Sequence, residues 1–309
     1  MKRKTVLLAV LAAAALGILA PGSRSRAEGE IRVLPTDLSG GAPYEATVKT
    51  NPEVYEDPTI RVERHTVYHK ENPYNIAYFY ADVTIRHASQ LRTASADPKG
   101  FLTGWQETGQ RIARRVNAVL ALDGDFCDNY RKNERRKYCL RQGVVYRDTV
   151  AENLDMLLID EDGNFHVYRS GADLAEKNKE EIDGKKIVNA FQFGPALVID
   201  GEPAEDEYIL DPAHSPVTAE PEKKAARMCI AQVDELHYFV LTNWFGINLA
   251  QLRDLVLSIT PCKTLYVMDG GNSAQLIYLK SHVNQSETNG RKITDIIYFA
   301  SADFVEESK

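Results

Sequence analysis

Short apolar runs that end at an aspartate and a glycine recur along this chain. Residues 118–122, 196–199 and 264–268 are each long enough for a buried strand, and an Asp-Gly pair follows each of them directly. A further pair, Asp162-Gly163, separates two strand-like segments in the manner of a β-hairpin turn. Strand-length segments divided by such turns predict a fold that is dominated by β-sheet.

Helical periodicity is confined to a few segments. Residues 248–259 begin with Asn248, which has Gln251 three positions later as in a capping box, and they carry an apolar stripe. Residues 104–117 also predict a helix, and the charged residues 171–184 predict a helix at the surface. We therefore expect an α+β fold, a single β-sheet-rich domain over residues 59–309 with a mixed sheet and a few helices. Further strands are expected at residues 60–69, 75–86, 188–201, 226–232, 237–242 and 293–300.

The first residues have the layout of a secretory signal peptide. A basic start is followed by an uncharged apolar segment and then by small residues around Ala27, which predicts a signal peptide over residues 1–27. The apolar segment is shorter than the roughly 20 residues that a spanning helix needs. We expect the mature protein to be secreted or held in the cell envelope, with no stable membrane span. Residues 28–58 lack periodicity and predict a tail or linker.

The distribution of charge excludes one class of function. Loss of residues 1–27 would change the formal net charge from −7 to −12, because it removes five basic and no acidic residues. Such an acidic surface argues against a nucleic-acid-binding protein. Basic residues nevertheless gather between Asp128 and Arg141. This basic loop is either a solvated loop or a cationic flap that attracts an anionic substrate.

Four cysteines are present, which in an exported protein predicts disulfides. Three pairings are compatible with the sequence. A Cys127–Cys139 bond would close a short loop, and a Cys229–Cys262 bond would join two predicted strands. The cysteines and histidines lack the spacing of a structural zinc site.

Several polar groups follow directly after the apolar run at residues 264–268, at the predicted end of that strand. Asp269 follows the strand, Gly270 and Gly271 allow a tight turn whose backbone N–H groups can converge on an anion, and Asn272 and Ser273 add side-chain donors. An ordinary Asp-Gly turn is the simpler explanation of the segment taken alone.

Five landmarks occur in a fixed order along the chain. They are residues 117–126 with Gly124-Asp125-Phe126, residues 193–201, Arg227 at the start of a hairpin, Gly246 before a short helix, and residues 269–273. In this order they resemble the phosphodiester glycosidase family, which includes the lysosomal N-acetylglucosamine-1-phosphodiester α-N-acetylglucosaminidase. The resemblance covers roughly residues 75–300. Two departures are visible, since the family usually has a third glycine where Asn272 stands and often an aromatic residue at Cys127.

The resemblance implies an exported hydrolase that cleaves the bond between a sugar anomeric carbon and phosphate in sugar-1-phosphodiesters of the cell envelope or of exopolysaccharide. Asp269 and Asp125 are the predicted catalytic carboxylates, and Arg227 suits the phosphate because its guanidinium is a fork of N–H donors. A calcium or magnesium ion on Asp269 or Asp125 is compatible with these oxygen ligands. The expected substrate-binding residues are Gly270, Gly271, Asn272, Ser273, Gly124 and Asn243.

Structural explanations compete with these roles. Arg227 can equally form a salt bridge at the sheet edge, and Asp125 can simply shape its turn. Phe193 fits a pocket wall better than a chemical role. The alternative function is a non-catalytic envelope protein of the same fold, which binds phosphorylated glycan without cleaving it.

Overall fold

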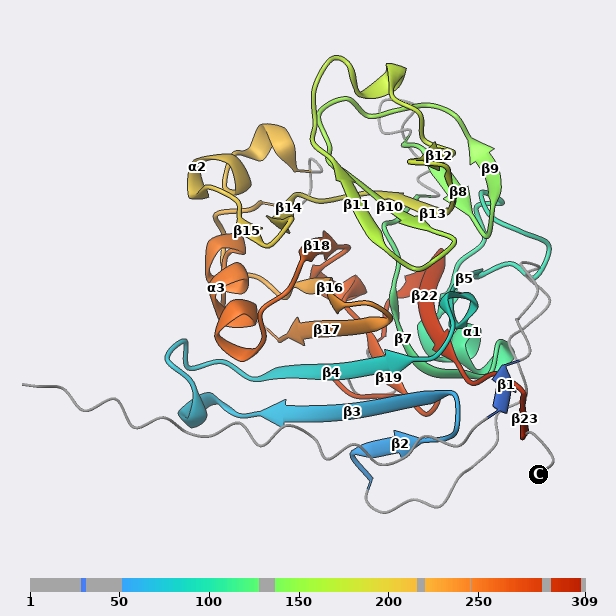
Figure 1. Ribbon diagram of the computed structural model, residues 1–309. Helices are drawn as coiled ribbons and strands as arrows, with labels where there is room; N and C mark the ends of the chain where they lie inside the picture. Colours follow the sequence, from blue (N-terminus) through green and yellow to red (C-terminus); the bar gives the residue numbers. More distant parts are fainter. Residues whose placement is uncertain are drawn as a thin grey trace, which may run out of the picture.

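The computed structural model describes residues 29–31, 52–127, 137–215, 220–244, 246–284 and 290–306. Strands dominate it and helices are few (Figure 1). Three sheets of five or more strands make up most of the fold, and every strand pair in the described residues is antiparallel. The predicted α+β class therefore holds at the level of composition, whereas the predicted mixture of parallel and antiparallel pairs is wrong.

The largest sheet has eight strands in the order β15-β14-β18-β16-β17-β4-β3-β2. A hairpin joins β16 to β17, and α3 (Leu249–Ile259) then crosses over so that β18 pairs with the other side of β16. Asn248 and Gln251 form the expected capping box at the start of α3. The strands of this sheet are β2 (Val54–Glu56), β3 (Ile60–Val67), β4 (Tyr78–Ile85), β14 (Ala196–Ile199), β15 (Glu202–Pro203), β16 (Met228–Asp234), β17 (His237–Asn243) and β18 (Thr264–Met268).

The second sheet has five strands in the order β20-β19-β7-β22-β5. Leu120 and Leu122 of β7 belong to the main core together with the eight-stranded sheet, whereas Ala118 and Ala121 pack with α1 (Gly109–Arg115) in a smaller core. Both faces of β7 are thus covered, which explains why residues 118–122 are all apolar. These strands are β5 (Leu91–Ser95), β7 (Ala118–Asp123), β19 (Leu276–Tyr278), β20 (Ser281–His282) and β22 (Asp295–Ala300).

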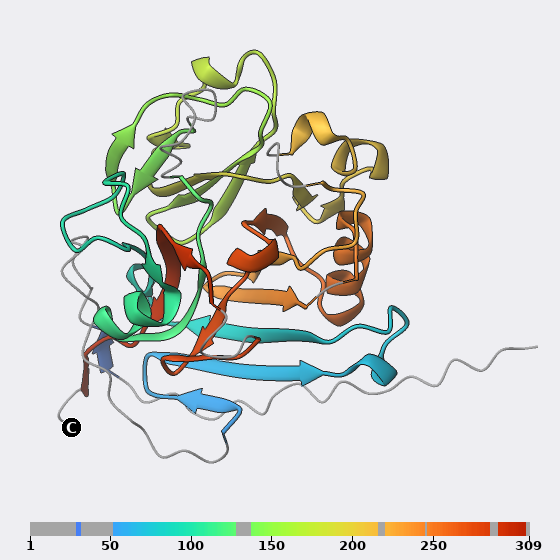
Figure 2. The same ribbon diagram turned by 180° about the vertical axis from the view of Figure 1, so that it is seen from behind.

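The third sheet carries the hairpin that was predicted around Asp162-Gly163. Its main path runs β11-β10-β13-β8-β9, and β12 pairs with β13. It lies beside the other two sheets in both views (Figures 1 and 2). Its strands are β8 (Cys139–Arg141), β9 (Val144–Arg147), β10 (Met156–Asp160), β11 (Phe165–Tyr168), β12 (Glu181–Ile182) and β13 (Lys185–Gln192).

Short elements complete the described chain. Two small ribbons pair β1 (Gly29–Ile31) with β23 (Phe304–Glu306) and β6 (Glu107–Thr108) with β21 (Lys292–Ile293). The remaining helix is α2 (Asp206–Ile209), and the 3-10 turns are His69–Glu71, Ala88–Gln90, Leu174–Glu176, Pro212–His214 and Gly271–Ser273. No helix among the described residues is long and apolar enough to cross a membrane.

Several predicted boundaries change. The predicted tail at residues 28–58 contains β1 and β2, and β2 pairs with β3 as part of the largest sheet. The predicted helix over residues 171–184 is wrong, because that segment forms the short turn Leu174–Glu176 and β12. The predicted signal peptide lies outside the described residues.

Candidate functional site

Asp269 and Arg227 lie opposite each other at the ends of two paired strands. The antiparallel register of β16 and β18 pairs Met228 with Met268, so the next position on each strand brings Arg227 across from Asp269. Both residues line one cavity, while the Arg227 guanidinium itself donates to the backbone carbonyls of Glu220 and Lys223. The register of the sheet therefore joins two predicted site residues that are far apart in the sequence.

The glycines after Asp269 allow two segments to approach closely. A Cβ atom on Gly270 would lie 2.8 Å from the carbonyl oxygen of Ala226, which is too close for any other residue without a backbone shift. Gly271 has a φ of 60°, a left-handed conformation that favours glycine. Its N–H donates to the same Ala226 carbonyl at 2.9 Å. The Gly271 N–H therefore holds the turn against Ala226, while Gly271 itself lines the cavity, and its role in substrate binding stays a prediction.

Ser273 contacts the side chain of Asp269. Its side chain is buried, and it makes a hydrogen bond to the Asp269 carboxylate. Its backbone N–H donates to the carbonyl of Gly270 at 3.1 Å, which closes the turn. Ser273 thus orients the carboxylate and does not itself line the pocket.

Arg227 is a buried cation that has no carboxylate partner among the described residues. One terminal nitrogen donates to the backbone carbonyls of Glu220 at 2.8 Å and Lys223 at 2.6 Å, while the buried Nε has no partner in the described chain. Burial lowers the pKa of Arg227 to about 10, and the Glu220 charge offsets this only in part. Arg227, a residue that is 5% exposed and has no carboxylate partner in the described chain, is thus suited to an anionic ligand.

Asn243 positions Arg227 without reaching the pocket. Its Oδ1 accepts the Arg227 backbone N–H at 2.9 Å, and its Nδ2 donates to the Ala225 carbonyl at 3.0 Å. The side chain is fully buried. Both polar atoms of its amide thus fix the backbone around Arg227, and a role of Asn243 in substrate binding stays a prediction.

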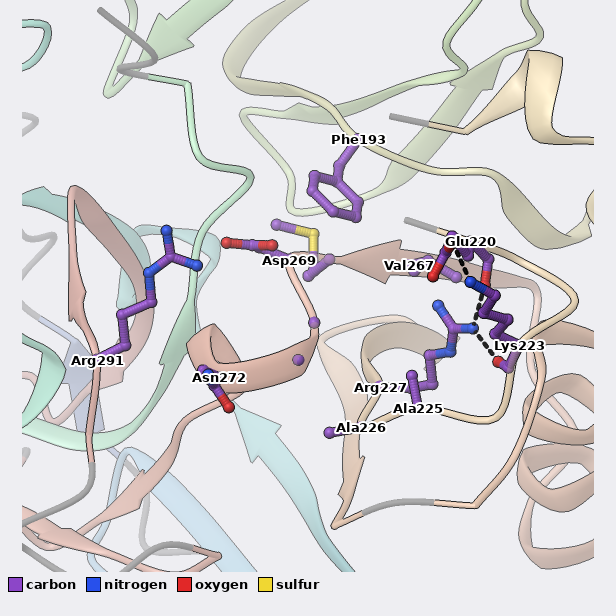
Figure 3. Close-up of a pocket in the computed structure, with 13 residues that line it drawn as sticks. Phe193, Glu220, Lys223, Ala225, Ala226, Arg227, Val267, Asp269, Asn272 and Arg291 are labelled. Carbon is purple, nitrogen blue, oxygen red and sulfur yellow. Dashed lines mark hydrogen bonds and ion pairs between the residues drawn. The ribbon is translucent and has the colours of Figure 1, made fainter. Parts of the chain in front are cut away.

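A cavity of about 210 Å³ lies in front of these residues. Figure 3 shows the Asp269 carboxylate between Arg291 on one side and Arg227 on the other, with Asn272 below and Phe193 above. Glu220 and Lys223 form an ion pair at the rim beside Arg227. The wall also contains Ala225, Ala226, Val267, Met268, Gly270 and Gly271.

Asp269 is the pocket-lining carboxylate without a salt bridge in the described chain. Burial raises its pKa above the ordinary value of 3.8, whereas the Ser273 hydrogen bond and the charges of Lys137 and Arg291 lower it. The group is thus an accessible carboxylate whose basicity is increased by partial removal from water.

Asp125 lies behind the pocket in a buried ionic cluster. Its Oδ1 accepts from Arg141 at 2.6 Å, its Oδ2 accepts the Gln192 backbone N–H at 2.9 Å, and Asp295 contacts the same guanidinium at 3.3 Å. All three charged side chains are almost completely excluded from solvent. These contacts give Asp125 a structural role, since both oxygens are occupied and Asp125 is not among the residues that line the cavity, and its catalytic role stays a prediction.

Gly124 also has a structural role in place of the predicted binding role. A Cβ atom there would lie 2.4 Å from an oxygen of Asp295, so only glycine fits. Its carbonyl accepts the backbone N–H of Asp269 at 3.2 Å, and its own N–H donates to the Asp295 carbonyl at 3.1 Å. Gly124 thereby links the ends of β7, β18 and β22 behind the pocket.

The buried cluster does not suit a divalent cation. Ligand atoms of Asp125, Cys127 and Asp295 lie within 4.8 Å of one another, but the Arg141 cation donates to both carboxylates and already occupies the oxygens that an ion would need. In the pocket, Asp269 and the Asn272 amide are few ligands for Ca²⁺, which takes six to eight oxygens. The prediction of a calcium or magnesium ion stays a prediction, and the chemistry below is derived without it.

The cysteines are four buried thiols in the structure. Cys127 and Cys139 are hydrogen-bonded to each other, which raises the pKa of the Cys127 thiol and lowers that of Cys139. The predicted disulfides stay a prediction. Of the possible pairs, Cys127 and Cys139 have side chains that are in contact.

The basic loop divides into two parts. Residues 128–136 lie outside the described residues. Lys137 and Arg141 are buried, which contradicts a solvated loop for that end of the segment. Lys137 donates from Nζ to the Asp125 carbonyl and lies over the Phe193 ring, 5.2 Å from its centroid.

Sequence reasoning missed Arg291 and the buried Asp123. Arg291 lines the pocket from the start of β21, and nothing in its local sequence distinguishes it from an ordinary surface arginine. Asp123 Oδ1 accepts the Gln275 N–H at 3.0 Å, and its buried Oδ2 has no partner in the described chain. Burial and the Asp269 charge raise the pKa of Asp123 well above its ordinary value. The sequence did offer a signal for Asp123, because it ends β7 and forms an Asp-Gly pair with Gly124.

Comparisons with known proteins agree with this architecture. A family model described as phosphodiester glycosidase matches residues 116–300. The chain therefore belongs to the phosphodiester glycosidase family.

Solved structures share the fold at low sequence identity. The zebrafish N-acetylglucosamine-1-phosphodiester alpha-N-acetylglucosaminidase catalytic domain, auto-inhibited by its pro-peptide, has a TM-score of 0.60 and 14% identity, over 88% of each chain. A hypothetical protein from Synechocystis has a TM-score of 0.54 and 13% identity, over 83% of this chain and 64% of the other. No curated protein sequence matches the chain.

Proposed function

We propose that this protein hydrolyses the bond between the anomeric carbon of a sugar and the phosphate of a sugar-1-phosphodiester. The observation that supports this most strongly is that Asp269 and Arg227, at the ends of β18 and β16, line the same cavity. Arg227 is a buried guanidinium that lacks a carboxylate partner in the described chain, and Asp269 is an accessible carboxylate of raised pKa. Membership of the phosphodiester glycosidase family supports this choice of substrate class.

The reaction needs only a small set of groups. Water adds to the anomeric carbon, the bond from this carbon to the phosphate oxygen breaks, and the phosphomonoester leaves with the bonding electron pair. Arg227 would stabilise the negative charge that develops on the phosphate. Because phosphate is a good leaving group, the step does not require a second carboxylate as a strong general acid.

Asp269 supplies the remaining chemistry. A carboxylate beside the anomeric carbon either stabilises the positive charge of an oxocarbenium-like centre or accepts a proton from the attacking water. Ser273 holds the carboxylate, and Gly270 and Gly271 allow the turn after Asp269 to pack against the backbone of Ala226, next to Arg227. These contacts fix the geometry before substrate binds.

The test is turnover by purified mature protein on a panel of sugar-1-phosphodiesters, with GlcNAc-1-phosphate diesters included. We expect release of equal amounts of free sugar and phosphomonoester. Tight binding of the diesters without release would favour the alternative, a phosphoglycan-binding protein of the same fold. Absence of both binding and release across the panel would reject this site for phosphorylated glycans.

Export and metal dependence belong to the same proposal. The sequence of residues 1–27 supports export, and the natural substrates would then be glycans of the cell envelope or exopolysaccharide. Processing is tested by sequencing the N-terminus of the exported protein. Metal dependence is tested by dialysis against EDTA, followed by addition of Ca²⁺ or Mg²⁺.

Replacement of Arg227 by lysine is expected to lower kcat/KM about 30-fold. Lysine keeps the charge but loses the fork of N–H donors, and a charge-assisted hydrogen bond contributes about 2 kcal/mol. Steady-state kinetics on one sugar-1-phosphodiester measure the effect. Exchange of the exposed Lys263 for arginine is the matched control, and equal activity of wild type and Arg227→Lys would remove Arg227 from phosphate binding.

The pH dependence of kcat/KM reports the ionisation of Asp269. The reaction needs the carboxylate, so activity is expected to rise with pH through the Asp269 pKa, which burial places above 3.8. Arg291 lowers that pKa, so Arg291→Gln should move the acidic limb to higher pH. Pre-steady-state or steady-state profiles between pH 3 and 8 check this, with the exposed Lys292→Gln as control. A shift to lower pH in Arg291→Gln would contradict it.

A further inference from the structure

Arg291 and Asn272 form a second polar wall of the pocket. Figure 3 places them on the side of Asp269 that is away from Arg227. Both line the cavity and both are exposed. The cavity thus offers hydrogen-bond donors on two opposite sides of one carboxylate.

The backbone holds Arg291 at this wall. Its carbonyl oxygen accepts from Gln275 Nε2 at 2.7 Å, and Gln275 is itself buried and accepts the Gly109 N–H at 3.2 Å. The guanidinium lies over the ring of Phe126, 5.8 Å from its centroid. Within the described chain it forms no salt bridge, and Asp269 is also free of a direct ion pair with it. The side chain is therefore available to a ligand.

The positions of Arg227 and Arg291 indicate which end of the substrate lies on each side of Asp269. The proposed phosphate lies against Arg227 and the anomeric carbon lies against Asp269, so the sugar ring extends towards Asn272 and Arg291. One phosphate cannot occupy both sides of Asp269. A neutral sugar would offer no anion to the exposed Arg291 guanidinium, whereas an anionic sugar would gain charge-assisted hydrogen bonds from it.

We infer that the sugar that is released carries an anionic group of its own, such as the carboxylate of a uronic acid, and that Arg291 and Asn272 bind it. This inference rests on the proposed function, since it uses the same cavity and the same orientation. It restricts the substrates to acidic sugar-1-phosphodiesters. Arg291 forms the charged hydrogen bonds, and the Asn272 amide contacts a neighbouring hydroxyl or the same anion.

Binding of two matched substrate fragments, each a sugar that keeps its 1-phosphate, tests the inference without any need for turnover. Glucuronic acid 1-phosphate and glucose 1-phosphate differ only in the carboxylate. Isothermal titration calorimetry on the wild-type protein should give at least about tenfold tighter binding of the acidic sugar, as one charge-assisted hydrogen bond provides. Arg291→Gln should bind the two equally, and Lys292→Gln, which removes an adjacent exposed charge, should keep the preference.

Other binding results overturn the inference. Equal binding of the two phosphates by wild type, binding of neither, or a preference that persists in Arg291→Gln would each show that Arg291 does not recognise an anionic sugar. Turnover of the methyl phosphodiesters of the same two sugars separates this failure from a failure of the proposed function. Hydrolysis of both diesters at equal kcat/KM would keep the function and reject the acidic sugar. A fall in kcat for both diesters in Arg291→Gln would assign Arg291 to the reacting centre instead.

Discussion

Replacement of Asp269 by asparagine is expected to lower kcat/KM for a sugar-1-phosphodiester by a factor of about 10³, within the range that one positioned acid–base group contributes. Asparagine keeps the shape of the side chain but can neither hold a negative charge beside the anomeric carbon nor accept a proton from water. Because Asp269 is the pocket-lining carboxylate without a salt bridge in the described chain, no neighbouring acid there replaces it. Release of free sugar over several hours measures the residual rate.

The matched control is Asp200→Asn. Asp200 also follows a strand and precedes a glycine, but it does not line the pocket. It should retain full activity, and both variants should keep the thermal stability of the wild type to within a few degrees. Activity within tenfold of wild type in Asp269→Asn would show that another group performs the chemistry.

Replacement of Asp125 by alanine is expected to lower the free energy of unfolding by about 3–5 kcal/mol, the usual cost of removing one partner from a buried ion pair. Arg141 would keep Asp295 at 3.3 Å but lose its shorter contact at 2.6 Å, and the Gln192 N–H would lose its acceptor. Urea unfolding followed by circular dichroism measures the change.

Two comparisons separate this structural role from a catalytic one. Asp148→Ala removes an exposed aspartate and should change stability by less than about 0.5 kcal/mol. Asp125→Asn keeps an acceptor oxygen for Arg141 and should retain measurable turnover at low temperature, where the protein stays folded. Unchanged stability together with complete loss of activity in Asp125→Asn would return Asp125 to the catalytic site.

Local sequence signals predicted the strands and the main helix well. The hairpins around Gly163 and between β16 and β17 are confirmed, as is the capping box of α3. These features depend on neighbours within a few residues. The charged segment over residues 171–184 has helix-forming residues, but Leu174 is the only buried residue of its short turn. The segment therefore lacks the apolar stripe by which a helix would pack against the rest of the protein.

The site was predictable only in part. Asp269 and Arg227 could be proposed because the family resemblance pointed to them, but the pairing of β16 with β18 that brings their strand ends together appears only in the sheet. The ionic cluster around Asp125 depends on Arg141, which the sequence places in a basic loop and the fold places in the interior. Asp125 and Asp269 look alike in sequence because both follow buried strands. Their different surroundings come from packing that involves three sheets.

The crossover through α3 has a consequence for how the protein gains activity. Arg227 precedes β16, and Asp269 follows β18, which pairs with β16 only after β17 and α3 have been placed. The β16–β17 hairpin depends on local contacts, whereas insertion of β18 between β14 and β16 requires contacts between distant segments, which form slowly. A chain that has folded this hairpin alone therefore has an arginine without its carboxylate. Catalytic competence is then a property of the completed sheet, and a partly folded chain is inactive even when most of its strands are formed.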